Sequence, residues 1–177
     1  MTYKNFMLQY MQNSDHYAKV LSLVANVKKQ LWIGTADIKD LYVKQGTISI
    51  PFLGLLSQKI TQGVEIRLIH AKEPGPNFRA DFDKYPNLFA GLERVLCPRV
   101  HFKMLIFDFK LAYIGSANLT GAGLGMKSNT IHNFETGILT DIPEIVENAI
   151  QQFDDVWIGK HCKNCRRKSF CGDRIIE

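Results

Sequence analysis

The sequence predicts an α/β sandwich in which helices flank a mixed β-sheet, followed by a short cysteine-rich tail. Segments with helical and with strand periodicity alternate along most of the chain, a pattern typical of layered α/β folds. The chain has 177 residues, of which 46% are apolar, so it can bury one hydrophobic core and no more. We therefore expect one globular domain over residues 1–158 and a basic, cysteine-rich element over residues 159–177.

Two helix–strand pairs are predicted in the first half of the chain. Apolar residues recur at helical spacing through 15–29, and the short apolar run 31–34 that follows is typical of a buried strand. Pro51 stands where a first helical residue is expected and Gly63 where a helix would stop, so a second helix is predicted between them. Residues 64–70 then have the composition of a second strand.

The second half is predicted to complete the sheet. A loop rich in proline and glycine at 72–76 precedes a shorter helical pattern at 88–96. Three β-rich runs and a closing helix follow, at 100–107, 111–114, 134–140 and 143–157. Because some of these strands are joined by helices and others by short turns, the sheet is expected to be mixed.

The charge of the chain is concentrated in its tail. Lys and Arg total 22 against 17 Asp and Glu, a formal net charge of +5, and the tail carries Lys160, Lys163, Arg166, Arg167 and Lys168. Such a distribution suits a polyanionic partner. The first residues lack the apolar segment of a signal peptide, and no apolar run approaches the ~20 residues of a membrane span. We therefore expect a cytoplasmic protein without stable membrane association.

The most informative motif is His101-x-Lys103-x4-Asp108-x6-Gly115-Ser116-x-Asn118. Side chains alternate faces along a strand, so His101 and Lys103 are expected to project from the same side. After the next strand, glycine would let the backbone approach a ligand closely, and the serine and asparagine offer donors to anionic oxygens. The motif therefore predicts an oxyanion-binding pocket.

This spacing resembles the signature of the phospholipase D superfamily, and all six of its positions are matched. Further along the chain, Asn133-Phe134-Glu135 resembles the Asn-x-Glu element that follows the signature in that superfamily. The resemblance implies a phospholipase D-like catalytic domain over residues 1–158. It also implies a hydrolase that cleaves phosphodiesters.

The resemblance further implies a role for each signature residue. His101 would attack phosphorus and form a phosphohistidine intermediate, while Lys103, Ser116 and Asn118 would bind the phosphate oxygens. Glu135 would orient the imidazole of His101, as buried carboxylates do for other catalytic histidines. For Asp108 we favour an orienting or structural role. This chemistry requires no metal.

The chain contains a single copy of the signature, although a second histidine is needed to protonate the leaving oxygen. One-signature members, such as the small bacterial endonucleases of the superfamily, resemble homodimers with the site across the subunit interface. We therefore predict a homodimer in which two copies of His101 face each other. The alternative is a degenerate member that binds phosphate without turning it over.

The cysteines form a second candidate site. Cys162, Cys165 and Cys171 lie within ten residues of each other, and Cys97 is the only other cysteine. Clustered thiols in a reducing compartment favour a structural zinc ion over disulfides, with Cys97 or His161 as the fourth ligand. An iron–sulfur cluster held by the four cysteines is a further alternative, as are unligated or redox-paired thiols.

The signature does not identify the substrate. The basic tail and Arg79, Arg94 and Arg99 favour DNA or RNA, which makes an endonuclease the preferred interpretation. A phospholipase D or phosphatidyltransferase-like activity on lipid is the main alternative among enzymes. A noncatalytic nucleic-acid-binding subunit is the alternative from a different class of protein.

Overall fold

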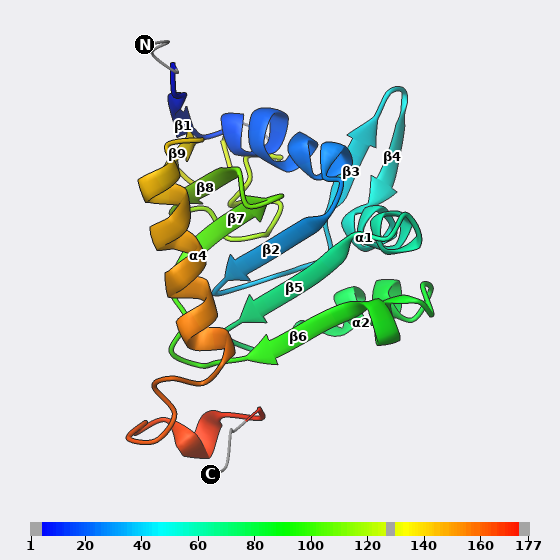
Figure 1. Ribbon diagram of the computed structural model, residues 1–177. Helices are drawn as coiled ribbons and strands as arrows, with labels where there is room; N and C mark the ends of the chain where they lie inside the picture. The colour runs from blue at the N-terminus through cyan, green and yellow to red at the C-terminus, as the bar shows by residue number, and fades with distance from the viewer. Residues whose placement is uncertain (1–4, 127–129, 174–177) are drawn as a thin grey trace.

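A seven-stranded mixed sheet forms the centre of the molecule (Figure 1). The computed structural model describes residues 5–126 and 130–173. The strand order is β1-β9-β8-β7-β2-β5-β6. In chain order these strands are β1 Leu8–Gln12, β2 Gln30–Thr35, β5 Glu65–His70, β6 Leu92–Leu96, β7 Lys103–Phe107, β8 Leu111–Gly115 and β9 Thr136–Thr140. Strands β2, β5 and β6 are parallel, and β7, β8, β9 and β1 form an antiparallel series beside them.

Helices cover both faces of this sheet, which confirms the predicted α/β architecture. The helix α4, Pro143–Trp157, packs on one face against β7 and β8 (Figure 1). The helix α1, Phe52–Thr61, packs on the other face together with two tight helical turns, His16–Val20 and Leu21–Asn26. The remaining elements are short, namely β3 Tyr42–Gln45, β4 Ile48–Pro51, α2 Pro76–Phe82, α3 Leu88–Gly91 and the turn Lys168–Phe170.

The central strand β7 supplies side chains to both hydrophobic layers. Met104 and Ile106 are buried in the layer that includes α4. Leu105 and Phe107 are buried in the layer that includes α1. A strand covered on both faces needs apolar residues at every position, which explains the continuous apolar run in this part of the sequence.

Two predicted helices differ from the structure. The segment 15–29 is helical only as a π turn and a 3-10 turn, not as one α-helix. The prediction for 88–96 was wrong in its second half, because α3 ends after one turn and the chain continues as the edge strand β6. The four-residue spacing of Leu92 and Leu96 fits a helix, but it also fits one side of a strand, and parallel pairing with β5 determines the outcome. The strands β1, β3 and β4 and the helix α2 were not predicted.

One end of the sheet collects the candidate site residues. The carboxyl end of β2 lies beside the amino end of β7, because these two strands are antiparallel. The carboxyl end of β8 reaches the same place, since Lys103 pairs with Gly115. His101 and Glu135, which precede β7 and β9, therefore lie near this end, whereas Asp108 follows β7 at the opposite end.

Candidate active site

The side chains of His101 and Lys103 meet at the start of β7. His101 is exposed and lies two residues before the strand, while Lys103 is the first strand residue. Nζ of Lys103 lies 3.2 Å from Nδ1 and 3.4 Å from Nε2 of His101, and it donates to the His101 carbonyl oxygen at 2.8 Å. A neutral imidazole can accept a hydrogen bond from this ammonium group. Because His101 lies outside the strand, its contact with Lys103, and not strand alternation, determines where the imidazole lies.

Lys103 places a buried positive charge in the site, since its exposed fraction is only 6%. Burial lowers the pKa of its ammonium group, and the Glu135 carboxylate acts in the opposite direction. A cation with little hydration interacts strongly with an anion that replaces the missing water. Lys103 is therefore suited to hold a phosphate oxygen.

The loop after β8 holds the side chain of Asn118 in one orientation. Its Oδ1 accepts a hydrogen bond from the backbone N–H of Asp37 at 3.1 Å and lies 3.3 Å from Oγ1 of Thr35. The Thr35 hydroxyl also accepts from the backbone N–H of Leu119 at 3.3 Å. These contacts tie the oxygen end of the amide to the end of β2, so the nitrogen end remains to serve as a donor.

Thr35 and Asp37 are site-positioning residues that sequence reasoning missed. Thr35 is the last residue of β2 and Asp37 lies two residues beyond it, in a part of the chain that carries no residue of the motif. The sequence offered one signal for them, namely that both polar residues closely follow the predicted apolar strand 31–34. Their importance becomes visible only when β2 is placed next to β7.

Ser116 and Glu135 are hydrogen bonded across the end of the sheet. Oγ of Ser116 donates to Oε2 of Glu135, and Nδ2 of Asn133 donates to Oε1 of Glu135 at 3.0 Å. The backbone N–H of Glu135 donates to Oδ1 of Asn13 at 3.3 Å. Within the described residues, none of the hydrogen bonds of Glu135 leads to His101. The structure thus gives Glu135 a different set of partners, and its predicted role in orienting the imidazole stays a prediction.

Gly115 is required by packing within the protein. A Cβ at this position would lie 2.3 Å from Oη of Tyr113 and 2.6 Å from the carbonyl oxygen of Thr136. Neither atom has room to move easily, because Tyr113 is buried and Thr136 belongs to the neighbouring strand. Packing within the protein is thus sufficient to explain a glycine at position 115. The expectation that Gly115 lets a ligand approach the backbone stays a prediction.

Asp108 lies at the far end of β7, away from His101. Its carboxylate accepts hydrogen bonds from the backbone N–H groups of Lys28, Lys29 and Gln30 at 2.7–3.2 Å. Burial acts to raise the pKa of Asp108, but these three donors together lower it below the ordinary value. In this structure Asp108 therefore holds the chain that enters β2.

An open cavity of about 460 Å³ lies at the end of the sheet that bears His101 and Lys103. It is lined by Tyr10, His101, Lys103, Ile114, Gly115, Ser116, Thr136, Gly137 and Ile138. Among these lining residues, His101 is the sole histidine. Three other histidines precede the tail in the part of the chain that the structure describes, and each contacts a nearby backbone carbonyl oxygen through Nδ1. They are His16, His70 and His132. The cavity thus combines one histidine with a buried cation and the Ser116 hydroxyl, groups that can bind and attack a phosphate. Asn118, Glu135 and Asp108 are not among its lining residues.

The family described as "Cardiolipin synthase, PLD-like domain" matches residues 20–157, which include His101, Lys103 and every other residue of the signature. The chain belongs to the phospholipase D superfamily. A comparison with curated protein sequences finds no significant match. The signature recognised in the sequence and the family match therefore agree.

Solved structures share the fold of this superfamily member at low sequence identity. Nuc from Salmonella typhimurium, described as a phospholipase D family member, has a TM-score of 0.65 at 17% identity, covering 87% of this chain and 95% of its own. NucT from Helicobacter pylori has a TM-score of 0.65 at 15% identity, covering 87% and 97%. TrmBL2, an archaeal chromatin protein, has a TM-score of 0.59 at 16% identity, covering 85% and 52%.

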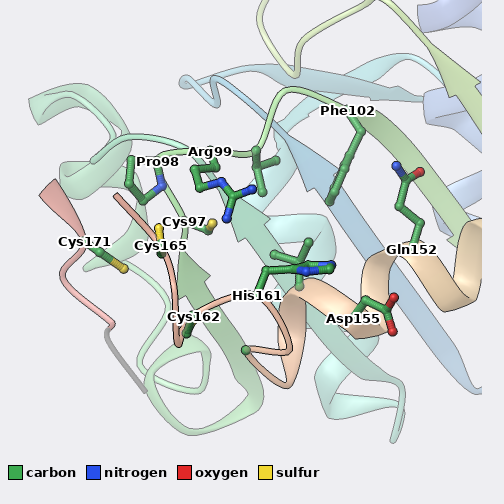
Figure 2. Close-up of a pocket in the computed structure, with 13 residues that line it drawn as sticks. Cys97, Pro98, Arg99, Phe102, Gln152, Asp155, His161, Cys162, Cys165 and Cys171 are labelled. Atoms are coloured by element: carbon green, nitrogen blue, oxygen red, sulfur yellow. The ribbon is translucent and has the colours of Figure 1, made fainter. Parts of the chain in front are cut away.

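The cysteines of this phospholipase D superfamily member do not line the cavity that contains His101. Cys97, Cys162, Cys165 and Cys171 line a second cavity of about 280 Å³, and none of them forms a disulfide (Figure 2). His161 and Arg99 line the same cavity. Among the described residues, no helix is both long and apolar enough to cross a membrane.

Proposed function

We propose that the protein is a metal-independent phosphodiesterase that acts through a phosphohistidine intermediate, with nucleic acid as its substrate. The observation that carries this proposal is the contact between Lys103 Nζ and the imidazole of His101 in a cavity that also presents Ser116. A phosphate bound by the lysine would lie next to the histidine nitrogen. Phosphodiesterase chemistry in general agrees with membership in the phospholipase D superfamily.

The proposed reaction has two displacements at phosphorus. In the first, a nitrogen of the neutral His101 ring attacks phosphorus and the bond to the leaving oxygen breaks, while a second histidine donates a proton to that oxygen. In the second, this histidine takes a proton from water, the resulting oxygen attacks phosphorus, and the phosphorus–nitrogen bond breaks. Lys103 and Asn118 stabilise the negative charge on the non-bridging oxygens in both steps.

The second histidine is proposed to come from another copy of the chain. A sheet face beside the cavity is apolar and incompletely covered: Tyr10 of β1 pairs with Ile138 of β9, which pairs with Ile114 of β8. Tyr10 is 63% exposed, and Leu8 on the same face is 60% exposed. We call Leu8, Tyr10, Ile114 and Ile138 the β1 surface. A twofold contact through this surface would bring a partner's site toward the cavity and bury apolar side chains.

Two observations support nucleic acid as the substrate. The side chains of Lys160, Arg166, Arg167 and Lys168 are exposed on the tail, at the sheet end that also bears His101. TrmBL2, which shares the fold, is described as binding DNA. A cation-rich surface next to a phosphodiesterase site favours a polyanionic chain. The cytoplasmic location expected from the sequence stays a prediction.

Lipid remains the second candidate substrate, because the matching family is described as cardiolipin synthase-like. The discriminating experiment incubates the purified full chain, in EDTA, with single- and double-stranded DNA, with RNA and with a labelled phospholipid. We expect cleavage of a polynucleotide and no release of lipid head group. Release of head group alone would replace the nuclease by a phospholipase D or phosphatidyltransferase-like enzyme.

The matched variants for this experiment are His101→Ala and His132→Ala. His101 lines the cavity, whereas His132 is half-buried and is not among the lining residues. We expect the first to abolish cleavage and the second to retain it. Binding of DNA without cleavage by the wild-type chain would favour a noncatalytic nucleic-acid-binding subunit. Loss of cleavage in EDTA that returns with Mg²⁺ would contradict the metal-independent mechanism, because a cluster of thiols does not bind Mg²⁺.

A further inference from the structure

The C-terminal tail has no hydrophobic core of its own in the part that the structure describes. After α4 ends, most side chains of residues 158–173 are exposed, and Phe170 in the single turn of this segment is 66% exposed. Apolar burial therefore contributes little to its conformation. Segments of this kind are usually held by disulfides or by a metal ion.

The tail is nevertheless docked against the end of β6. The backbone N–H of Leu96 donates to Oδ2 of Asp173 at 2.6 Å, and Sγ of Cys171 donates to the carbonyl oxygen of Leu96 at 3.6 Å. Cys97 is the next residue after Leu96. These two contacts bring the cysteines of the tail to the one cysteine of the body.

The four thiols surround one cavity (Figure 2). Cys162 and Cys165 belong to one turn, in which the N–H of Cys165 donates to the carbonyl oxygen of Cys162 at 3.1 Å. Both line the cavity together with Cys97 and Cys171. Cysteines from two distant parts of the chain thus lie around one cavity. Cysteine thiolates are common ligands of zinc in proteins.

The surroundings of Cys165 suit a thiolate ligand. The backbone N–H of Arg167 donates to Sγ of Cys165 at 3.4 Å, a contact that a negatively charged sulfur strengthens. Arg99 and Lys168 also place positive charge beside this sulfur. Four thiolates around a zinc ion carry a net negative charge, which these two cations would offset.

We propose that Cys97, Cys162, Cys165 and Cys171 bind one zinc ion that fastens the tail to the segment leading into His101. Each zinc–sulfur bond forms as the thiol releases its proton to solvent. No group of three or more His, Cys, Asp or Glu residues among the described ones already has the spacing that holds a metal. Binding therefore requires the four sulfur atoms to move closer together.

Cys97 is a better fourth ligand than His161. Figure 2 shows the ring of His161 extending toward Gln152 and Asp155, away from Cys171. His161 also interacts electrostatically with Asp155. A site that uses Cys97 would join the tail to the body, whereas a site completed by His161 would close within the tail alone.

The first experiment measures the metal content of the full chain purified without added metal, by elemental analysis. We expect one zinc ion per chain in the wild type, at least a tenfold loss of zinc in Cys97→Ser and Cys165→Ser, and no loss in His161→Gln. Wild-type protein that contains iron, or no metal, would overturn the proposal. Retention of zinc by Cys97→Ser together with its loss from His161→Gln would overturn the assignment of Cys97.

The second experiment does not depend on how the variants fold. The wild-type chain is treated with a thiol-alkylating reagent before and after a zinc chelator, and modified cysteines are identified by mass spectrometry. We expect all four cysteines to be protected at first and to react after chelation. Four thiols that react equally before chelation would contradict a metal site. Thiols that react only after a reductant is added would indicate disulfides in its place.

Discussion

The pH dependence of the proposed reaction follows from the buried ammonium group of Lys103. Burial lowers the pKa of Lys103, and the Glu135 carboxylate opposes this shift. As the pH rises, Lys103 loses its proton earlier than an exposed lysine does, and the phosphate then loses its cation. Removal of the Glu135 charge lowers the Lys103 pKa further. In Glu135→Gln we therefore expect the alkaline limb of kcat/KM to move to lower pH.

Ser116→Ala is the control for this experiment. It removes the hydrogen bond between Ser116 and Glu135 but leaves the carboxylate charge in place. We expect activity to fall roughly tenfold or more, since a donor to the site is lost, while the alkaline limb stays at its wild-type pH. An equal displacement of that limb in both variants would show that hydrogen bonding, and not charge, controls Lys103.

Thr35 positions Asn118 without lining the phosphate cavity. Its buried hydroxyl donates to the carbonyl oxygen of Asp37 at 2.8 Å, lies 3.3 Å from Oδ1 of Asn118 and accepts from the N–H of Leu119. Thr35→Val keeps the shape but removes these contacts. We expect a loss of about 1–3 kcal/mol in unfolding free energy and a roughly tenfold lower kcat/KM from the displaced amide.

Denaturant unfolding and steady-state kinetics measure these two effects of Thr35→Val. Thr35→Ser retains the hydroxyl, so it should keep most of the activity. If valine and serine variants lose activity to the same degree, the hydroxyl of Thr35 does not position the site.

At the scale of secondary-structure elements, Asp108 is expected to stabilise the junction of β7 with β2. Its carboxylate accepts three backbone N–H groups, and its pKa is lowered by them despite burial. A carboxylate with a lowered folded pKa contributes stability above its unfolded pKa, about 3.9, and that contribution is lost as the pH falls through the folded pKa. Asp108→Asn should therefore cost about 1–3 kcal/mol at neutral pH.

The pH series distinguishes this role of Asp108 from simple packing. Unfolding free energies of wild type and Asp108→Asn should begin to converge as the pH falls below the unfolded pKa of about 3.9, and they should meet only below the lowered folded pKa of Asp108, where its side chain is uncharged as well. Asp83→Asn, a change at an exposed aspartate, should alter stability by no more than about 0.5 kcal/mol. A difference between wild type and Asp108→Asn that is independent of pH would mean that the charge is irrelevant.

The elements were predictable where local pattern and tertiary pairing agree. The closing helix has the predicted bounds, Pro143–Trp157, because its apolar stripe and its proline start are both local features. The edge strands β1 and β6 were missed, because each is formed by pairing with a neighbour, β9 or β5, and its own pattern is weak. The pattern of neighbouring residues in the sequence does not show which strands will pair.

The same limit applies to the site. The signature identified His101, Lys103 and Ser116 because their types and spacing are themselves the pattern. Thr35 and Asn13 act through hydrogen bonds to Asn118 and Glu135, residues far away in sequence. These positioning residues become recognisable only when the strand order brings their loops to one end of the sheet.

At the scale of the whole molecule, the cavity with one histidine leads to a prediction about assembly. The β1 surface includes Leu8, which is 60% exposed and lies two residues from the cavity-lining Tyr10. Ile48 is also 60% exposed, but it belongs to the β3–β4 hairpin, which lies away from β1 (Figure 1). Leu8→Lys places a charge in the proposed interface, where burial of an unpaired charge is costly. We expect this variant to be monomeric and at least tenfold less active, whereas Ile48→Lys should remain dimeric and active.

Size-exclusion chromatography with light scattering measures the assembly state of these two variants, and nuclease activity is followed at several protein concentrations. If the weakness of Leu8→Lys comes from dissociation, its activity should recover as the concentration rises, because mass action restores the dimer. Excess His101→Ala subunits should also suppress wild-type activity, since each mixed dimer would hold only one of the two required imidazoles. A wild-type monomer with full activity would contradict the shared site and would require the second histidine to come from within the chain.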